Sequence, residues 1–275
     1  MFDPKTHRYP FPEDTASHYL VVKKNDGTVF DANYPYLDKS KAMAFKRFWA
    51  RVGLTLLVFP VARVYLGLKI VGRKNLKIHK AVLDGGFLTV SNHIHLWDYI
   101  SIMKAIRPRK PNVLIWAPNI RGENGKMMRA VGGIPIPEDD IGATRAYMEA
   151  VKEVLQGGVL QIYPEGSMWE YYAPVRPFKR GPSYFAIKHD KPILPMGFSY
   201  RKPGWFRRVV MRQEAAITLT IGEPIWANPE LKGKEKENDL TIRCHQAVCR
   251  LCGIDPSENL YGPIYDNSKR IDYYD

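Results

Sequence analysis

The sequence is poor in cysteine, with 3 among 275 residues, all within positions 244–252. Such closely spaced thiols form no disulfide framework, so an apolar core has to hold the fold, and the chain is long enough to bury one. The scarcity of cysteine also favours a reducing compartment. Cys249 and Cys252 have a spacing found in zinc sites, but such sites use two separated ligand pairs, so we interpret both as core residues of a helix.

Long hydrophobic runs are also missing. The N-terminus has no apolar segment of the signal-peptide type, so we expect no secretion. The charge-free run 52–62 is well short of the ~20 residues of a spanning helix, so we expect none. An apolar stripe at helical spacing over 43–68 predicts an amphipathic helix that Pro60 ends or kinks, followed by a second short helix. These helices would lie in a membrane interface or against the core.

Acidic residues are outnumbered: 28 Asp and Glu stand against 41 Lys and Arg, a net charge of +13. An excess of this size favours a polyanionic partner, which is nucleic acid, an anionic membrane or a phosphorylated substrate. Hydrophobic residues make up 45% and charged residues 25% of the chain, which excludes wholesale disorder.

The rest of the chain alternates between short apolar runs and helical patterns, which predicts an α/β fold: a mostly parallel sheet flanked by helices and preceded by the amphipathic two-helix motif. We divide the chain into an irregular arm (1–42), the amphipathic helices (43–70), an α/β domain (71–255) and an irregular tail (256–275). The predicted strands are 87–90, 113–116, 134–136, 159–163, 193–199 and 217–221, and the predicted helices are 99–106, 141–156, 183–189 and 239–252.

A histidine and an aspartate follow the first of these strands. His93 and Asp98 are five positions apart, and they can meet if His93 lies on the loop and Asp98 in the first helical turn. The carboxylate would then accept the Nδ1–H bond and leave Nε2 as a base, suited to take a proton from an alcohol. A loop histidine bonded to the backbone is the plainer alternative. A metal-dependent hydrolase using His93, His95 and Asp98 is another, although the sequence offers few further ligands.

Other short motifs follow at or near the ends of later predicted strands. They are Gly132-Gly133-Ile134-Pro135-Ile136, Pro164-Glu165-Gly166-Ser167, Phe178-Lys179-Arg180-Gly181, Pro192-Ile193-Leu194-Pro195 and Gly222-Glu223-Pro224-Ile225. In this order and approximate spacing, and together with Asn92-His93-x-x-x-x-Asp98, the segment 88–225 resembles the glycerol-phosphate and lysophosphatidic-acid acyltransferase family.

The resemblance implies that a fatty acyl group passes from acyl-CoA or acyl-carrier protein to the hydroxyl of a lysophospholipid, in the first instance 1-acyl-glycerol-3-phosphate, giving phosphatidic acid. It makes His93 the general base and Asp98 its orienting partner, with direct attack on the thioester and no cofactor or metal ion. It places Glu165, Gly166 and Ser167 at the acceptor head group. Lys179 would offer a point charge to a phosphate.

Two positions depart from the family pattern, and both are assigned to phosphate-binding arginines in the family. After the Gly-Ile-Pro strand stand Pro137-Glu138-Asp139-Asp140, and Met168 replaces the arginine that follows Glu-Gly-Thr. Arg176, next to the Phe178-Lys179 motif, is our candidate substitute. The departures leave a different lysolipid acceptor open as an alternative.

The partners expected from this interpretation are a lipid acceptor, an acyl thioester, an anionic membrane surface and acyl-carrier protein as one possible donor. We expect no nucleic acid, since no recognised module accompanies the basic residues. The expected location is peripheral, on the cytoplasmic face of a membrane. A non-catalytic lipid-binding protein of the same fold is a further alternative. The basic, aromatic stretch 201–208 would touch lipid head groups, donor phosphates or RNA, or form a plain hairpin.

Overall fold

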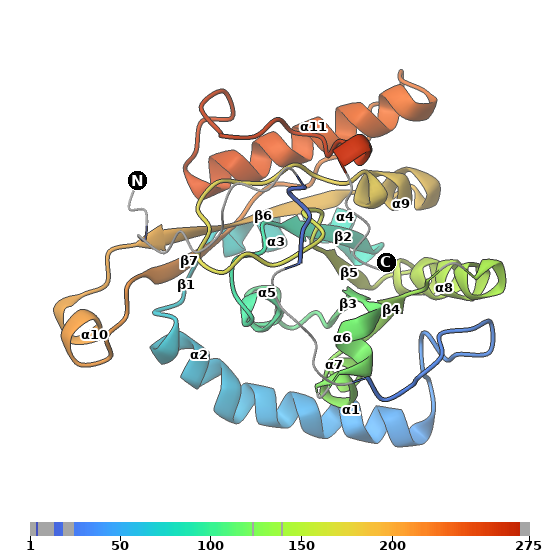
Figure 1. Ribbon diagram of the computed structural model, residues 1–275, viewed down its shortest axis with the longest axis horizontal. Helices are drawn as coiled ribbons and strands as arrows, with labels where there is room; N and C mark the ends of the chain where they lie inside the picture. Colours follow the sequence, from blue (N-terminus) through green and yellow to red (C-terminus); the bar gives the residue numbers. More distant parts are fainter. Residues whose placement is uncertain (1–3, 5–13, 19–24, 123, 139, 270–275) are drawn as a thin grey trace.

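A seven-stranded sheet forms the centre of the computed structural model, which describes residues 4, 14–18, 25–122, 124–138 and 140–269. The strand order is β1-β7-β6-β2-β5-β3-β4 (Figure 1), and all neighbours are parallel except the antiparallel pair β6–β7. The expected α/β fold with a mostly parallel sheet is confirmed. The strands are β1 Lys69–Val71, β2 Phe87–Ser91, β3 Pro111–Trp116, β4 Gly133–Ile136, β5 Val159–Ile162, β6 Ile193–Arg201 and β7 Ala216–Ile221.

Each face of the sheet is covered by helices, which explains why the central strands β2 and β5 are buried along their whole length. One face packs on α8 (Ile141–Val154), α9 (Gly181–His189) and α11 (Gly233–Cys252). The other face packs on α3 (Arg73–Ile78), α4 (Lys80–Asp84) and α5 (Asp98–Ala105). Figure 1 shows α9 and α11 on one side of the sheet and α5 on the other.

The local signals predict most of these elements to within a few residues. Asp140 accepts the backbone N–H of Ala143 at the start of α8, and Gly157, with φ of 94°, follows its end, as the sequence predicts. Helix α11 begins six residues before the predicted 239, and its three cysteines are buried core residues, as expected. Strand β1 and the short helices α3, α4, α6 (Ala117–Arg121), α7 (Gly125–Ala130) and α10 (Trp205–Val209) were not predicted.

The predicted end of the helix at Pro60 is wrong. Helix α1 (Lys41–Gly53), a π-helical turn (Leu54–Val58) and α2 (Phe59–Tyr65) form one continuous helix, which we call the long helix. The N–H of Phe59 bonds to the carbonyl of Leu54, so a wider π-helical turn comes directly before Pro60. A turn of this kind accommodates a residue that has no N–H to donate within a continuing helix. Among the described residues this is the one helix long and apolar enough, by length and composition, to cross a membrane, contrary to the expectation of none.

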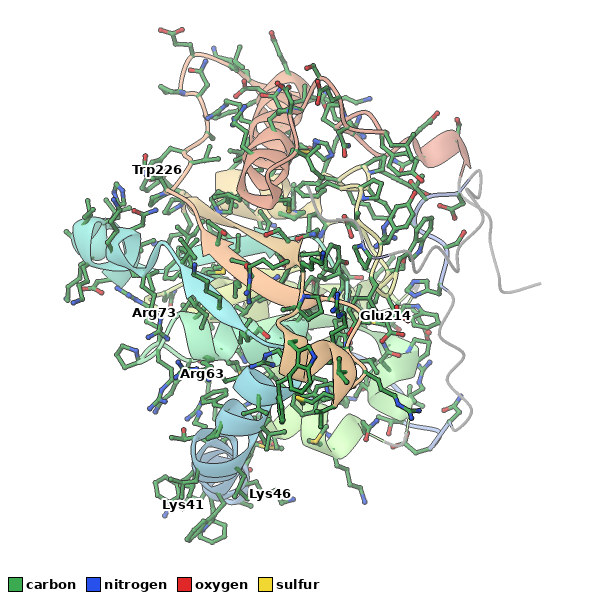
Figure 2. The ribbon with its side chains drawn as sticks, turned by 90° about the vertical axis from the view of Figure 1, so that its left-hand side faces the viewer. Lys41, Lys46, Arg63, Arg73, Glu214 and Trp226 are labelled. Atoms are coloured by element: carbon green, nitrogen blue, oxygen red, sulfur yellow. The ribbon has the colours of Figure 1, made fainter. Side chains whose placement is uncertain are left out.

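The long helix lies along the outside of the domain. Met43 at its N-terminal end and Leu54, Phe59 and Ala62 further on are buried, and α1 packs on α7 while α2 packs on α5. Figure 1 shows the helix running along the lower edge of the molecule. Lys41 and Lys46 lie at its N-terminal end (Figure 2). The other face of the long helix is open to solvent. Eight large apolar side chains of the helix are exposed: Phe45, Phe48, Trp49, Leu56, Leu57, Val61, Val64 and Tyr65.

The described parts of the arm and of the tail pack against the domain. Phe30 and Tyr36 are buried against α8, where the ring of Tyr36 meets that of Tyr147 edge to face. The tail returns to the centre: Tyr265 is buried, and its backbone N–H donates to the carbonyl of Phe178. The two ends of the chain therefore help to build the region described next.

Candidate active site

The sheet topology brings two of the motifs together. Strands β2 and β5 are parallel neighbours, so the loops that follow them leave the same edge of the sheet side by side. His93 follows β2, and Glu165 follows β5. The side-chain Oε2 of Glu165 accepts the backbone N–H of His93 at 3.0 Å, which ties the two loops together. We call this region the catalytic edge.

His93 and Asp98 meet as predicted. Asp98 is the first residue of α5 and is buried, and its Oδ2 lies 2.9 Å from Nδ1 of His93. The same oxygen accepts the backbone N–H groups of Ile94 at 2.7 Å and His95 at 2.9 Å, so the carboxylate is fixed by three donors. The imidazole is also stacked on the ring of Tyr163, with centroids 3.9 Å apart. With Nδ1 directed at the carboxylate, Nε2 is the nitrogen left for chemistry, and the side chain is 22% exposed.

Glu165, Ser167 and Arg176 form one buried network. The guanidinium of Arg176 donates to Glu165 Oε2 and to Ser167 Oγ, each at 2.7 Å, and to the carbonyl oxygen of Thr15 at 2.9 Å. It also lies over the ring of Trp169, 4.4 Å from the centroid. Burial lowers the pKa of Arg176, and the neighbouring carboxylate of Glu165 opposes that shift. All three side chains are at most a few per cent exposed, with their polar atoms directed at one another.

Lys179 lies across Gly166. Gly166 has φ of 84°, and a Cβ there would come within 2.9 Å of the Lys179 ammonium. The glycine therefore allows both the left-handed turn and the close approach of the lysine. The Lys179 ammonium also lies 5.0 Å from the centroid of the Tyr265 ring, and its backbone N–H donates to the carbonyl of Pro164. A cation thus stands directly beside the turn that follows β5.

The N-terminal arm contributes residues that the sequence did not point to. The ring of His18 is stacked on Trp116, at the end of β3, with centroids 4.1 Å apart. Burial, together with the positive charges of Lys179 and Arg176, lowers the pKa of His18 from 6.5 to about 4. Its neighbours place His18 at the catalytic edge. His18 lies in an irregular segment 75 positions before His93 in the sequence. No local pattern predicts that it lies near the catalytic edge, because only the folded sheet brings the two segments together.

The two departures from the family pattern have clear structural positions. Met168 is buried, so it presents no polar group to the catalytic edge. Both carboxylate oxygens of Glu138 accept hydrogen bonds from Arg121, at 3.0 and 2.8 Å. Asp139, the next residue of this segment, lies outside the described residues.

Metal chemistry gains no support from the side chains that the structure describes. Among them, no three His, Cys, Asp or Glu side chains gather in a way that would hold a metal ion. Both ring nitrogens of His95 have other neighbours: its Nδ1 accepts the backbone N–H of Trp97, and its Nε2 lies 3.8 Å from Glu170. The three residues of the hydrolase alternative therefore do not converge.

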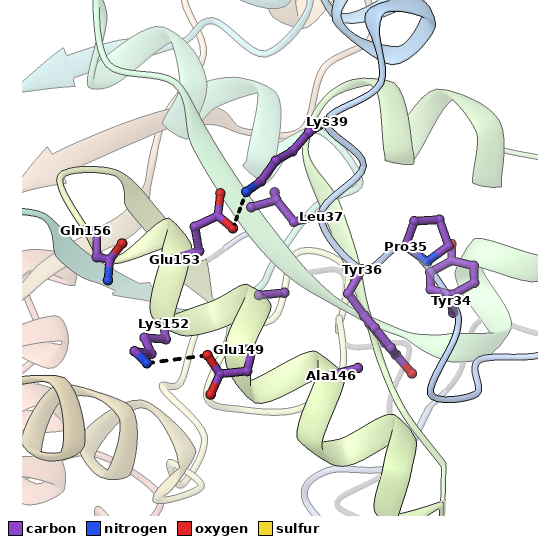
Figure 3. Close-up of a pocket in the computed structure, with 11 residues that line it drawn as sticks. Tyr34, Pro35, Tyr36, Leu37, Lys39, Ala146, Glu149, Lys152, Glu153 and Gln156 are labelled. Carbon is purple, nitrogen blue, oxygen red and sulfur yellow. Dashed lines mark hydrogen bonds and ion pairs between the residues drawn. The ribbon is translucent and has the colours of Figure 1, made fainter.

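A surface hollow between the arm and α8 lies away from the catalytic edge (Figure 3). Its charged side chains pair with one another: Lys39 with Glu153 at 2.6 Å, and Lys152 with Glu149 at 3.4 Å. Because its charges are neutralised in place, this hollow has no unmatched charge with which to recognise an ionic substrate.

A family model described as Acyltransferase matches residues 68–199. These residues belong to the acyltransferase family. The matched acyltransferase segment thus spans β1 to most of β6 and contains both loops of the catalytic edge.

The chain is also similar to the crystal structure of the 1-acyl-sn-glycerophosphate (LPA) acyltransferase PlsC from Thermotoga maritima. The identity is 18%, the match covers 78% of this chain and 85% of that one, and the TM-score is 0.46. A comparison with curated proteins finds no match.

Proposed function

We propose that this acyltransferase moves a fatty acyl group from a thioester, acyl-CoA or acyl-carrier protein, to the hydroxyl of a lysophospholipid. The first candidate acceptor is 1-acyl-glycerol-3-phosphate, which would give phosphatidic acid. One observation carries the proposal: a part-exposed imidazole whose Nδ1 is held 2.9 Å from a buried carboxylate, at the carboxyl edge of the sheet.

The chemistry follows from that pair. The hydroxyl oxygen of the acceptor attacks the thioester carbonyl carbon while Nε2 of His93 takes the hydroxyl proton. The tetrahedral intermediate collapses, the C–S bond breaks, and the imidazolium returns the proton to the departing thiolate. Asp98 keeps the proton on Nδ1 in the neutral imidazole and stabilises the cation that forms. Such a base contributes roughly 10²–10⁴-fold in rate.

Two groups of residues have different roles in this proposal. Lys179, beside the turn at Gly166, supplies the positive charge for the acceptor phosphate. Arg176 and Glu165 act as positioning residues, since their charges are engaged with each other and Glu165 also holds the backbone of His93. Ser167 belongs to the same network through its hydrogen bond from Arg176.

The long helix would hold the enzyme on a membrane surface. Its buried face packs on α5 and α7 along its length, so it lies parallel to the surface of the domain. A helix docked in this way crosses a bilayer only if the domain enters the bilayer too. Its exposed aromatic and aliphatic side chains and its lysines and arginines suit the interface of an anionic membrane. Peripheral attachment, on the cytoplasmic side, is therefore the proposed location.

A different lysolipid acceptor is the second candidate. It is favoured by Met168 and by the pairing of Glu138 with Arg121, which leave the two positions of the family's phosphate-binding arginines without a cation of their own.

The test is acyl transfer by the purified protein, with acyl-CoA and acyl-carrier protein side by side and a panel of lysophospholipids, read by mass spectrometry. We expect a phospholipid product with the parent protein and none with His93→Ala. His79→Ala, which changes a histidine between α3 and α4, is the matched control and should retain activity. Near-normal turnover by His93→Ala would contradict the base assignment, and no product from any acceptor would contradict the lipid substrate class.

A further inference from the structure

The hairpin between β6 and β7 exposes an apolar surface that none of the elements described by the structure covers. Helix α10 lies at its tip, and Trp205 is 68% and Phe206 58% exposed, with Val209 and Val210 also more than half exposed. Positions i, i+1, i+4 and i+5 share one side of a helix, so the four side chains form one apolar face. An exposed face of this kind marks an interaction site, since water solvates it poorly.

The hairpin is attached to the end of the long helix. Arg207 of α10 donates to the carbonyl oxygens of Val64 and Arg63, in the last turn of α2. Arg201, at the end of β6, donates to the carbonyl of Gly67 at 2.5 Å. Arg207 thus bonds to the last turn of the long helix, and Arg201 bonds to the segment that follows it. In both Figure 1 and Figure 2, α10 lies beside the C-terminal end of α2.

The charge of the hairpin tip is of one sign. The segment 202–212 contains Lys202, Arg207, Arg208 and Arg212 and no acidic residue, and Glu214 follows two positions later. A partner that buries the apolar face therefore also has to accept several positive charges. The interface of an anionic bilayer offers both, a hydrocarbon boundary and a layer of negative head groups, with about 1 kcal/mol per well-placed basic residue.

We propose that the hairpin tip, residues 202–212, is a second lipid-contacting element, and that its partner is an anionic bilayer. The proposal rests on the membrane-surface role proposed above for the long helix. The bonds of Arg207 make the two elements one docking surface, and the open face of α2 continues it through Val61, Val64 and Tyr65.

The docking surface reaches the catalytic edge. The ring of Tyr65 lies 5.3 Å from that of Trp97 and 6.2 Å from that of His95, and Leu96, between them in sequence, is 63% exposed. Two attachments of this kind would fix the orientation of the loop that carries His93 relative to the bilayer. An acyl chain would then reach the base without leaving the interface.

The test is flotation of the full chain with vesicles of phosphatidylcholine, with and without phosphatidylglycerol, in the absence of substrate. We expect the double variant Trp205→Ser, Phe206→Ser to bind the anionic vesicles about tenfold less than the parent. Trp226→Ser is the matched control: this tryptophan is 43% exposed and lies well away from α10 in Figure 2, so it should bind like the parent. Arg208→Glu should weaken binding to the anionic vesicles only.

Each outcome decides the proposal. If the double variant and Arg208→Glu both bind like the parent, the tip does not contact lipid and serves another partner, such as a protein. Arg208→Glu keeps the test open if the double variant fails to fold, which its melting curve reports. Because flotation is measured without turnover, an inactive protein that still floats through the tip contradicts the proposed reaction but not this proposal.

Discussion

The catalytic edge and the docking surface are built on opposite principles. At the catalytic edge, polar and charged groups are buried and held by several partners: Asp98 accepts three hydrogen bonds, and Arg176 is buried against Glu165. On the docking surface, the large side chains are apolar and exposed, and the charges surround them. The catalytic edge depends on a low dielectric and a fixed geometry. The docking surface depends on contact with an apolar environment such as the proposed bilayer interface.

This difference teaches how each region responds to change. A buried charge network is sensitive to the loss of a single atom group, because the partner left behind is desolvated and unpaired. An exposed apolar surface loses affinity in small steps, because each side chain contributes its own buried area. The four predictions below test this contrast, beginning with the largest expected effect.

Asp98→Asn should lower kcat by about 10³–10⁴-fold, because the amide cannot hold the imidazole in the productive tautomer or stabilise the imidazolium. The measurement is the initial rate of thioester consumption at saturating substrate. Asp190→Asn, at the end of α9, is a control outside the catalytic edge. A rate within a few fold of the parent would mean that the His93–Asp98 contact is structural only.

Arg176→Leu should destabilise the fold by about 3–5 kcal/mol, because it leaves Glu165 as a buried charge without its partner. Urea denaturation followed by circular dichroism gives the change in the free energy of unfolding. Adding Glu165→Gln should recover part of the loss, since the uncompensated charge is then removed. Arg145→Leu, an exposed arginine of α8, should change stability by no more than about 0.5 kcal/mol. Equal changes in the free energy of unfolding for Arg176→Leu and Arg145→Leu would contradict the special role of the buried pair.

Acid should lower the free energy of unfolding, because two histidines are buried in their neutral form. Burial lowers the pKa of His18 and of His245 from 6.5 to about 4, so between these values the unfolded chain binds more protons than the folded one. The free energy of unfolding is therefore highest above pH 6.5. It falls as the pH drops towards 4, by up to about 3 kcal/mol for each histidine.

The variant His245→Gln tests the acid effect, with the free energy of unfolding measured against pH. We expect a shallower fall between pH 6.5 and 4 than in the parent, whatever its stability at neutral pH. An unchanged slope would show that the burial of His245 does not govern acid sensitivity.

Leu56→Ser together with Leu57→Ser should weaken binding to anionic vesicles by roughly ten- to a hundredfold, since two exposed leucines of the long helix would no longer enter the interface. Ile141→Ser is the control, because Ile141 is 90% exposed at the start of α8, outside the docking surface. Flotation at rising salt should weaken binding further as the basic residues are screened. Parent-like binding by the leucine variant would refute the role of the long helix.

Local sequence predicted the elements and one contact of the site. The strands β2 to β7 follow from apolar runs, and the start of α8 follows from Asp140. The His93–Asp98 contact was predictable because both residues belong to a single loop and first helical turn, where spacing along the chain sets spacing in space. These features depend on neighbours in sequence, so one sequence was sufficient to find them.

What the sequence by itself determined is therefore an alternating α/β chain with a histidine and an acid at the end of one strand. Only the tertiary structure decided that Arg176 pairs with Glu165, that His18 reaches the catalytic edge, and that the hairpin tip caps the long helix. The continuation of the long helix past Pro60, through a π-helical turn and packed on α5 and α7, was also not predictable from the local sequence. Each of these depends on which distant segments the sheet brings together, and no local pattern carries that information.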